Sequence, residues 1–253
     1  MDYEQILRAQ ETLPGTTALY YKNLKTGASF EYNGAQPIIA ASVIKIPVMV
    51  EFFHQVAEGR ICENDLFTIK NEDKLPSCGA LTYMHEGLQV TALDLCTLMI
   101  ILSDNTATNM LIKHLGMANI NDRMKLLGLK HLLMTRLLFD GEAQKRGLEN
   151  RITASEIGIL LELIYCGALP YSDKMLDILK KQRLNGKMPF YLHGTPIAHK
   201  TGEDDGITHD VGIVFADEPF IACFLSEKTD VPAYERHIQT TSFLLTHGTA
   251  PQK

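Results

Sequence analysis

Apolar and aromatic residues alternate with polar ones near both ends of the chain, and this pattern predicts β-strands there. Residues 16–22 (TTALYYK) and 29–32 (SFEY) flank a glycine-containing connection, which predicts a β-hairpin. Three further strand segments follow residue 195 (PIAHKTG, HDVGIVFA and FIACFLS), separated by short turn-like breaks. An amphipathic helix over residues 232–245 is expected to close the chain.

Between these strands, the apolar residues recur with the period of a helix. Residues 41–59 (ASVIKIPVMVEFFHQVAEG) suit a helix of about four turns. Residues 90–102 predict a helix that is capped by Thr91 and apolar nearly all round, so this segment is expected inside a helical lobe. Further helices are expected over residues 105–114, 117–127 and 154–166, the last capped by Thr153.

The order of these elements predicts an α/β (α+β) fold. Two strands, a long helical middle and then three strands with a helix place the N-terminal hairpin beside the C-terminal strands. We expect one five-stranded antiparallel sheet flanked by helices, plus an all-helical lobe. Residues 1–40 with 190–253 would form the α/β lobe and residues 41–189 the helical lobe of a single domain over residues 1–253.

Composition excludes several classes of protein. The chain has 253 residues, 45% of them hydrophobic, and a net charge of −6, with no Lys/Arg block, which argues against a nucleic-acid or membrane partner. The N-terminal residues MDYEQILRAQETLPG lack the pattern of a signal peptide, and no apolar run is long enough to cross a bilayer. We expect a cytoplasmic monomer, or a periplasmic or secreted one if a leader has been removed.

Cysteine and histidine usage predicts reduced thiols and no metal site. The five cysteines are odd in number, widely spaced and without a C-x-x-C pair. The nine histidines form no H-E-x-x-H motif and no cluster with cysteine. No cofactor is therefore expected.

Candidate chemistry begins with a lysine inside an apolar run. Ser42 and Lys45 stand one helical turn apart, so their side chains can reach each other. A lysine that is desolvated and close to a second cation has a lowered pKa, and its neutral amine can take a proton from a serine near pH 7. The S-x-x-K pattern alone is common by chance, and the alternative is a lysine that extends its charge to solvent.

Two further motifs strengthen the catalytic interpretation. Ser103-Asp-Asn105 directly follows the apolar helix, and Lys200-Thr-Gly202 ends a predicted strand. With S-x-x-K they stand in the order and at the separations, about 60 and then about 100 residues, of penicillin-recognising serine enzymes. In these motifs, and in residues 103–109 (SDNTATN) and 209–214 (HDVGIV), the chain resembles the class A β-lactamase and penicillin-binding-protein superfamily. The resemblance covers nearly the whole chain.

The resemblance implies a catalytic role for each matching side chain. Ser42 would be the nucleophile and Lys45 its general base. Ser103 would pass a proton to the leaving nitrogen, and Asn105 would hold the substrate amide. Together these groups supply the nucleophile, base and proton donor that an acyl transfer needs.

The resemblance also implies how the substrate is held. Lys200, Thr201 and Gly202 form the segment that would bind the substrate carboxylate. The backbone N–H groups of Ser42 and Glu203 would form the oxyanion hole, which stabilises the negative charge that develops on the carbonyl oxygen.

The chain departs from the class A pattern in the loop that activates water. Class A enzymes use the glutamate of an E-x-x-L-N segment, and no such string lies between Arg136 and Thr153. The nearest match aligns Asp140 with that glutamate and Gln144 with the asparagine, and Glu142 is the alternative base. A general base must lie within hydrogen-bond reach of its water, so the shorter aspartate matters. For either carboxylate, the alternative is a salt bridge or helix cap.

A second departure concerns charge beside the K-T-G motif. The basic residue that many class A enzymes carry there is absent, and Thr208, His209 and Asp210 stand in its neighbourhood. His209 is the candidate substitute. Asp210 is expected to be a structural, hydrogen-bonded carboxylate.

The sequence thus predicts a serine hydrolase that works on a small-molecule substrate through an acyl-enzyme. The leading interpretation is a class A-type β-lactamase that hydrolyses the β-lactam amide. One alternative is a D-Ala-D-Ala peptidase or small-ester hydrolase. Another is a penicillin-binding sensor that stays acylated because nothing activates water.

Overall fold

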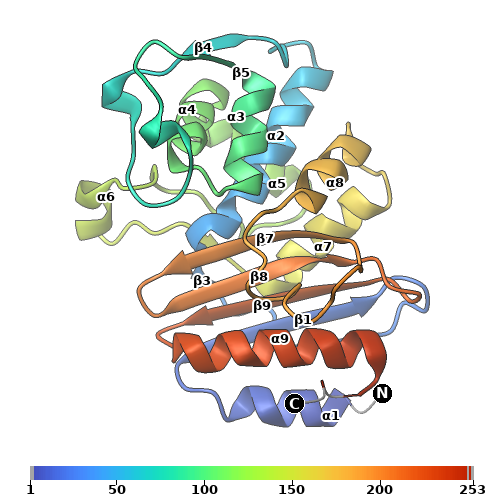
Figure 1. Cartoon of the computed structure of the whole chain (residues 1–253). Helices are drawn as coiled ribbons and strands as arrows, with labels where there is room; N and C mark the ends of the chain where they lie inside the picture. Colours follow the sequence, from blue (N-terminus) through green and yellow to red (C-terminus); the bar gives the residue numbers. More distant parts are fainter. Residues whose placement is uncertain (1–2, 250, 252–253) are drawn as a thin grey trace.

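A five-stranded antiparallel sheet forms the centre of the molecule within residues 3–249 and 251, which the computed structural model describes. In spatial order its strands are β2 (Ser29–Tyr32), β1 (Thr16–Asn23), β9 (Phe220–Glu227), β8 (Ile207–Val214) and β7 (Ile197–Asp204). Strand β1 pairs with β9 along its whole length, with Thr16 opposite Glu227 (Figure 1). The predicted union of the N-terminal hairpin with the C-terminal strands is therefore confirmed.

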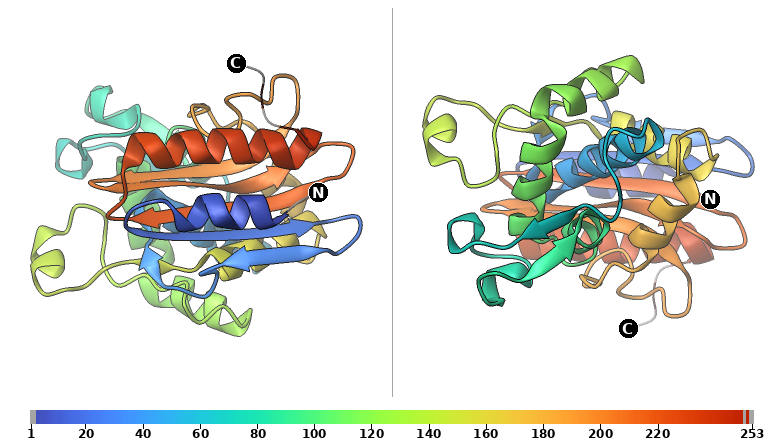
Figure 2. Two further views of the ribbon diagram at one scale, coloured as in Figure 1. Left: turned by 90° about the horizontal axis from the view of Figure 1, so that it is seen from below. Right: turned by 90° about the horizontal axis from the view of Figure 1, so that it is seen from above.

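Helices cover both faces of this sheet. On one face, α1 (Tyr3–Glu11) and α9 (Val231–His247) lie side by side (Figure 2). On the other face, α7 (Ala154–Tyr165) packs against β1 and β9, and α8 (Ser172–Lys180) packs against β7. Strand β8 is buried at every position rather than at alternate ones, because helices exclude water from both of its faces.

The remaining helices form the helical part of the molecule above the sheet in Figure 1. They are α2 (Lys45–Ala57), α3 (Ala92–Ile101), α4 (Asn105–Leu115), α5 (Met117–Leu126) and the short α6 (Gly141–Lys145). Short elements join these parts: strands β3 (Ile38–Ile39) and β6 (Arg151–Ile152), which pair, strands β4 (Leu66–Thr68) and β5 (Gln89–Thr91), which pair, and 3₁₀ turns η1 (Ala41–Ile44), η2 (Asn71–Asp73) and η3 (Leu81–Tyr83). Among the described residues, no helix has the length and apolarity that a bilayer crossing requires.

Two of the predicted helix starts are confirmed at the level of side chains. Thr91 accepts a hydrogen bond from the backbone N–H of Asp94, whose carboxylate accepts from the backbone of Thr91 in return, which is a capping box. Thr153 caps α7 by accepting from Glu156 N–H. The predicted helix over residues 41–59 instead begins as η1 and becomes α-helical at Lys45, so Pro47 lies in the first turn, where it costs little.

The sequence pattern missed three helices, the short α6 among them. Helix α1 buries only Ile6 and Gln10, so its apolar stripe is too sparse to stand out from a polar N-terminus. Helix α8 follows Tyr171, which has a left-handed backbone (φ 57°) and no side-chain cap, so the usual start signal is absent.

Candidate active site

The turn η1 and the start of α2 bring Ser42 and Lys45 together. The Nζ of Lys45 lies 2.9 Å from the Oγ of Ser42, as the three-residue spacing predicts. Lys45 has no exposed surface, whereas Ser42 is half-buried and lines a pocket. The lysine is thus sealed behind the serine, and the serine can still meet a substrate.

The S-D-N motif surrounds the same ammonium nitrogen with oxygen atoms. Lys45 Nζ lies 2.8 Å from Ser103 O, 2.9 Å from Ser103 Oγ and 2.9 Å from Asn105 Oδ1. Ser103 connects α3 to α4 with a left-handed backbone (φ 53°), a conformation that costs energy in a residue other than glycine. This turn directs both oxygens of Ser103 at Lys45, so local strain is used to complete the site.

Burial controls the charge of Lys45. Desolvation, followed by the positive charge of Lys200, holds the pKa of Lys45 well below its usual range. The lowered pKa favours the neutral amine that a general base requires.

A second buried lysine approaches Ser103 from the sheet. Lys200 on β7 places its Nζ 3.1 Å from Ser103 Oγ and donates to Thr201 O over 2.7 Å. Burial, and next the charge of Lys187, lowers the pKa of Lys200 to about 7. The hydroxyl of Ser103 thus lies between two lysine nitrogens and can carry a proton from one side of the site to the other.

Close packing of η1 on β7 brings together the segments that carry the two predicted oxyanion donors. A Cβ atom at Gly202 would lie 3.3 Å from Ser42 N and 3.2 Å from Val43 Cγ2, so glycine allows the strand to approach the turn. Glu203 is the next residue on the strand. The segments that carry both N–H groups, those of Ser42 and Glu203, therefore adjoin.

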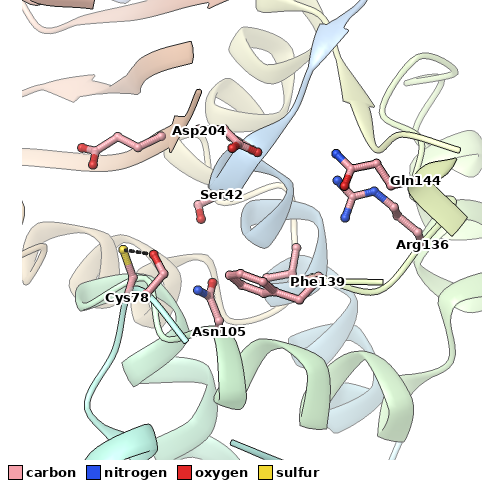
Figure 3. A pocket seen from close by; sticks show the side chains of 11 residues that line it. Ser42, Cys78, Asn105, Arg136, Phe139, Gln144 and Asp204 are labelled. Atoms are coloured by element: carbon pink, nitrogen blue, oxygen red, sulfur yellow. Dashed lines mark hydrogen bonds between the residues drawn. The ribbon is translucent and has the colours of Figure 1, made fainter. Parts of the chain in front are cut away.

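A pocket of about 450 Å³ opens in front of Ser42, between the helical part and the K-T-G end of the sheet. Figure 3 shows Asn105 and Phe139 on its helical side and Asp204 on the side of β7. Its lining residues are Ala41, Ser42, Ser77, Cys78, Asn105, Arg136, Leu138, Phe139, Gln144, Glu203 and Asp204. This is the crevice in which the sequence places the site.

Asp104 fixes the S-D-N motif and the loop opposite it. Its Oδ1 caps α4 by accepting from Ala107 N–H at 2.9 Å. Its Oδ2 accepts from the backbone of Ala80 at 2.7 Å and of Leu81 at 2.9 Å. The buried carboxylate thereby ties the loop that carries Cys78 to the helix start that carries the motif.

The loop between Arg136 and Glu149 does not present a carboxylate to the pocket, although the sequence pattern predicts that it supplies the water-activating base. Arg136 anchors it as expected, with two hydrogen bonds of 3.0 and 2.7 Å to Glu149. Asp140, however, caps α6 by accepting from Ala143 N–H at 2.9 Å, and the exposed Glu142 pairs with Lys145 at 2.8 Å.

Neither of these two carboxylates lines the pocket, so the structure does not bring Asp140 or Glu142 to Ser42. The physical reason is the turn of α6, which directs the Asp140 carboxylate back to its own helix. Leu138, Phe139 and Gln144 face the pocket instead.

His209 does not replace the missing basic residue. Its Nε2 donates to Ile39 O at 2.9 Å and its Nδ1 accepts from Ser226 N–H at 3.1 Å, which is the pattern of a neutral imidazole. Burial lowers its pKa to about 4, so it carries no charge at neutral pH. Asp210 is structural, as expected, because it accepts from Met188 N–H at 2.9 Å and binds His199 Nδ1 at 2.8 Å.

One buried charge near the site was not predicted. Lys187 lies in the irregular segment before β7, and its side chain is 4% exposed. No motif or period marks this position, so only its placement in the fold identifies it.

All five cysteines are free, and the described residues hold no group of three or more metal-binding side chains.

Known proteins resemble this chain over its whole length. The family model of the beta-lactamase enzyme family matches residues 3–243. The beta-lactamase structure from Sphaerobacter thermophilus is 28% identical, with a TM-score of 0.89 over 100% of both chains. The structure of PBP-A is 32% identical, with a TM-score of 0.87 over 97% of this chain and 94% of that one.

A curated relative gives a shorter match. It is a beta-lactamase from Rhodobacter capsulatus, 29% identical over 113 residues, which are 45% of this chain and 38% of the relative. The chain thus matches well under half of that relative's length, whereas the family model spans nearly all of this chain. This chain belongs to the beta-lactamase enzyme family.

Proposed function

We propose that this protein is a serine hydrolase that opens the amide bond of β-lactams through an acyl-enzyme intermediate. The observation that supports this most strongly is the 2.9 Å separation of Ser42 Oγ from the fully buried Nζ of Lys45. A neutral amine at hydrogen-bond distance from a hydroxyl at the base of a pocket is the arrangement that nucleophilic catalysis by serine requires.

Acylation uses the two serines and the lysine between them. Lys45 takes the proton of Ser42 while Ser42 Oγ bonds to the substrate carbonyl carbon. The backbone N–H groups of Ser42 and Glu203 bind the oxyanion that forms. When the C–N bond breaks, Ser103 gives its proton to the nitrogen and regains one from the Lys45 ammonium 2.9 Å away.

Substrate orientation comes from the opposite walls. Asn105 binds the amide of the acyl group, and Lys200 with Thr201 binds a carboxylate. An anion beside Lys200 favours its charged form, so binding offsets the effect of burial on its pKa. Water then attacks the ester carbonyl, and cleavage of the bond to Ser42 Oγ releases the acid.

One observation favours a second candidate, a penicillin-binding peptidase that is acylated by β-lactams and released slowly. Among the described residues of the 136–149 loop, those that line the pocket are Arg136, Leu138, Phe139 and Gln144, none of which is a carboxylate. A loop carboxylate to activate the deacylating water is thus not in position. The 32% identity to PBP-A is consistent with this candidate.

Turnover and adduct lifetime separate the two candidates. The protein is mixed with a chromogenic cephalosporin and with benzylpenicillin, and hydrolysis and intact mass are followed together. Rapid turnover supports the hydrolase, and a persistent adduct of one penicillin supports the peptidase. Ser42→Ala is expected to abolish both signals, while Ser77→Ala, which removes another hydroxyl of the same pocket, is expected to retain them. Absence of adduct and turnover in the unaltered protein contradicts both.

A further inference from the structure

Lys187 is a buried cation that the proposed reaction does not use. Its side chain is 4% exposed, and its Nζ lies 3.0 Å from Glu203 Oε1. It also donates to the backbone oxygens of Gly202 at 3.3 Å and His209 at 3.2 Å. Burying an ammonium group costs free energy unless the group is paired, so the burial of Lys187 beside Glu203 calls for a functional explanation.

Glu203 connects Lys187 to the active site. It follows the K-T-G segment directly and lines the pocket in front of Ser42. It also lines a second hollow, where it meets Lys187. Its side chain is 57% exposed, so a negative charge stands at the mouth of the pocket, next to the residues proposed to hold a substrate carboxylate.

Without a cation to offset the Glu203 charge, the charges around the pocket would disfavour binding of a substrate carboxylate. Asp204 adds a second negative charge to the same wall. Arg136 faces the pocket from the other side, but its guanidinium is already bonded to Glu149. His209 is uncharged at neutral pH. A substrate anion beside Lys200 would therefore be repelled by Glu203 unless a cation offsets its charge.

We propose that Lys187 is a positioning residue that neutralises Glu203, so that the pocket admits substrates carrying a carboxylate next to the bond that is cleaved. This inference rests on the proposed serine-hydrolase function. Lys187 acts through Glu203 and does not bind the substrate, because it lies outside the lining of the active pocket. Its two bonds to backbone oxygens hold it beside the strand that carries Glu203.

The test compares Lys187→Met, Glu203→Gln and the double variant on two matched ester substrates. Both esters share one acyl group, and the leaving group ends in a carboxylate in one and in a carboxamide in the other. Lys187→Met is expected to raise KM about fivefold or more for the carboxylate ester and less than about twofold for the carboxamide, because only the former meets the unpaired Glu203. Changes in kcat are expected to stay within about threefold.

Rescue by the second substitution distinguishes this role from a structural one. Glu203→Gln alone is expected to lower KM for the carboxylate ester, and the double variant is expected to return within about twofold of the unaltered protein. Equal effects on both esters, or a double variant as impaired as Lys187→Met, would overturn the inference.

If Lys187→Met does not fold, Glu203→Gln decides alone. An unchanged or raised KM for the carboxylate ester would then contradict the neutralising role. Failure of the unaltered protein to form an acyl-enzyme with benzylpenicillin would instead remove the proposed function, so the two failures are distinguishable.

Discussion

At the scale of single residues, the buried lysine of the S-x-x-K motif is accommodated by a lowered pKa, caused chiefly by desolvation, and by its polar partners. Four oxygen atoms surround Lys45 Nζ within 2.9 Å. A neutral amine offers two donors and one acceptor, so Ser42 can donate its proton to the lone pair while the nitrogen donates to Ser103 and Asn105. The same arrangement lowers the cost of burial and would prepare Ser42 for the proposed nucleophilic role.

Lys45→Arg is expected to reduce the rate of acylation by about 10²–10⁴-fold, because a guanidinium keeps its proton and cannot act as a base. Stopped-flow mixing with a chromogenic cephalosporin measures this rate. Lys113→Arg, which alters a largely exposed lysine on α4, is the matched control and is expected to leave the rate unchanged.

Several of these residues were predictable from sequence, and others were not. The three motifs place Ser42, Ser103 and Lys200 because they lie at the start of one predicted helix, directly after another, and at the end of a predicted strand. The sequence does not determine the role of Asp140, since a carboxylate four residues from an arginine can either face the pocket or cap a turn. Lys187 belongs to no pattern, because its partners, two backbone oxygens and the Glu203 carboxylate, come from distant positions in the sequence.

At the scale of elements, one aspartate joins α4 to the loop that faces it. Asp104 binds three backbone N–H groups, from Ala80, Leu81 and Ala107. Gly79 must be glycine for this contact, since it has a φ of 120° and an added Cβ would overlap the Asp104 side chain. The position of the S-D-N motif thus depends on the contacts between this loop and Asp104.

Asp104→Ala is expected to lower the free energy of unfolding by about 3 kcal/mol, because two buried N–H groups and one partly buried N–H group lose their acceptor and each costs about 1–3 kcal/mol. Urea denaturation followed by circular dichroism measures the change. Acylation is expected to slow as well, because Ser103 and Asn105 lose their support.

Asp140→Ala is the control, since Asp140 also caps a helix but in a more exposed loop. The expected loss is about 1 kcal/mol, the usual cost of removing a cap. Deacylation is expected to stay within about threefold of the unaltered rate, because the Asp140 carboxylate does not line the pocket. A large accumulation of acyl-enzyme in Asp140→Ala would return this residue to the mechanism.

At the scale of the whole molecule, helices on both sides of the sheet bury titratable groups that the proposed reaction does not use. His209 on β8 and His237 on α9 both have a pKa lowered to about 4, in each case chiefly by burial. The unfolded chain binds protons at an ordinary histidine pKa of about 6.5, which the folded protein excludes until about pH 4. Stability is therefore expected to be lost as the pH falls through this window.

Each buried histidine is expected to contribute up to about 3 kcal/mol of this loss. Urea denaturation at several pH values between 7 and 4 measures it. His237→Phe retains the aromatic packing against Tyr234 and is expected to flatten the dependence, whereas His193→Gln, at an exposed position, is expected to leave it unchanged. Equal slopes in both variants would exclude His237 as a source of acid lability.

The architecture was largely predictable because the order of strands and helices allows few topologies. The N-terminal hairpin and the C-terminal strands meet in one sheet, as the pattern indicates, and helices α3 and α7 begin at the predicted caps. Helices α1 and α8 escaped prediction because each is short and takes its stability from packing against the sheet or α9 rather than from its own sequence.

The pH dependence of the acylation rate at saturating substrate tests the central claim most directly. If Lys45 is uncharged near neutrality, this rate reaches its plateau well below about pH 10.4, where an ordinary lysine titrates, and it falls only in acid. Ser42→Ala shows no acylation at any pH. A rate that instead rises tenfold per pH unit up to about pH 10 would show that Lys45 keeps its proton, and would contradict this account of the nucleophile.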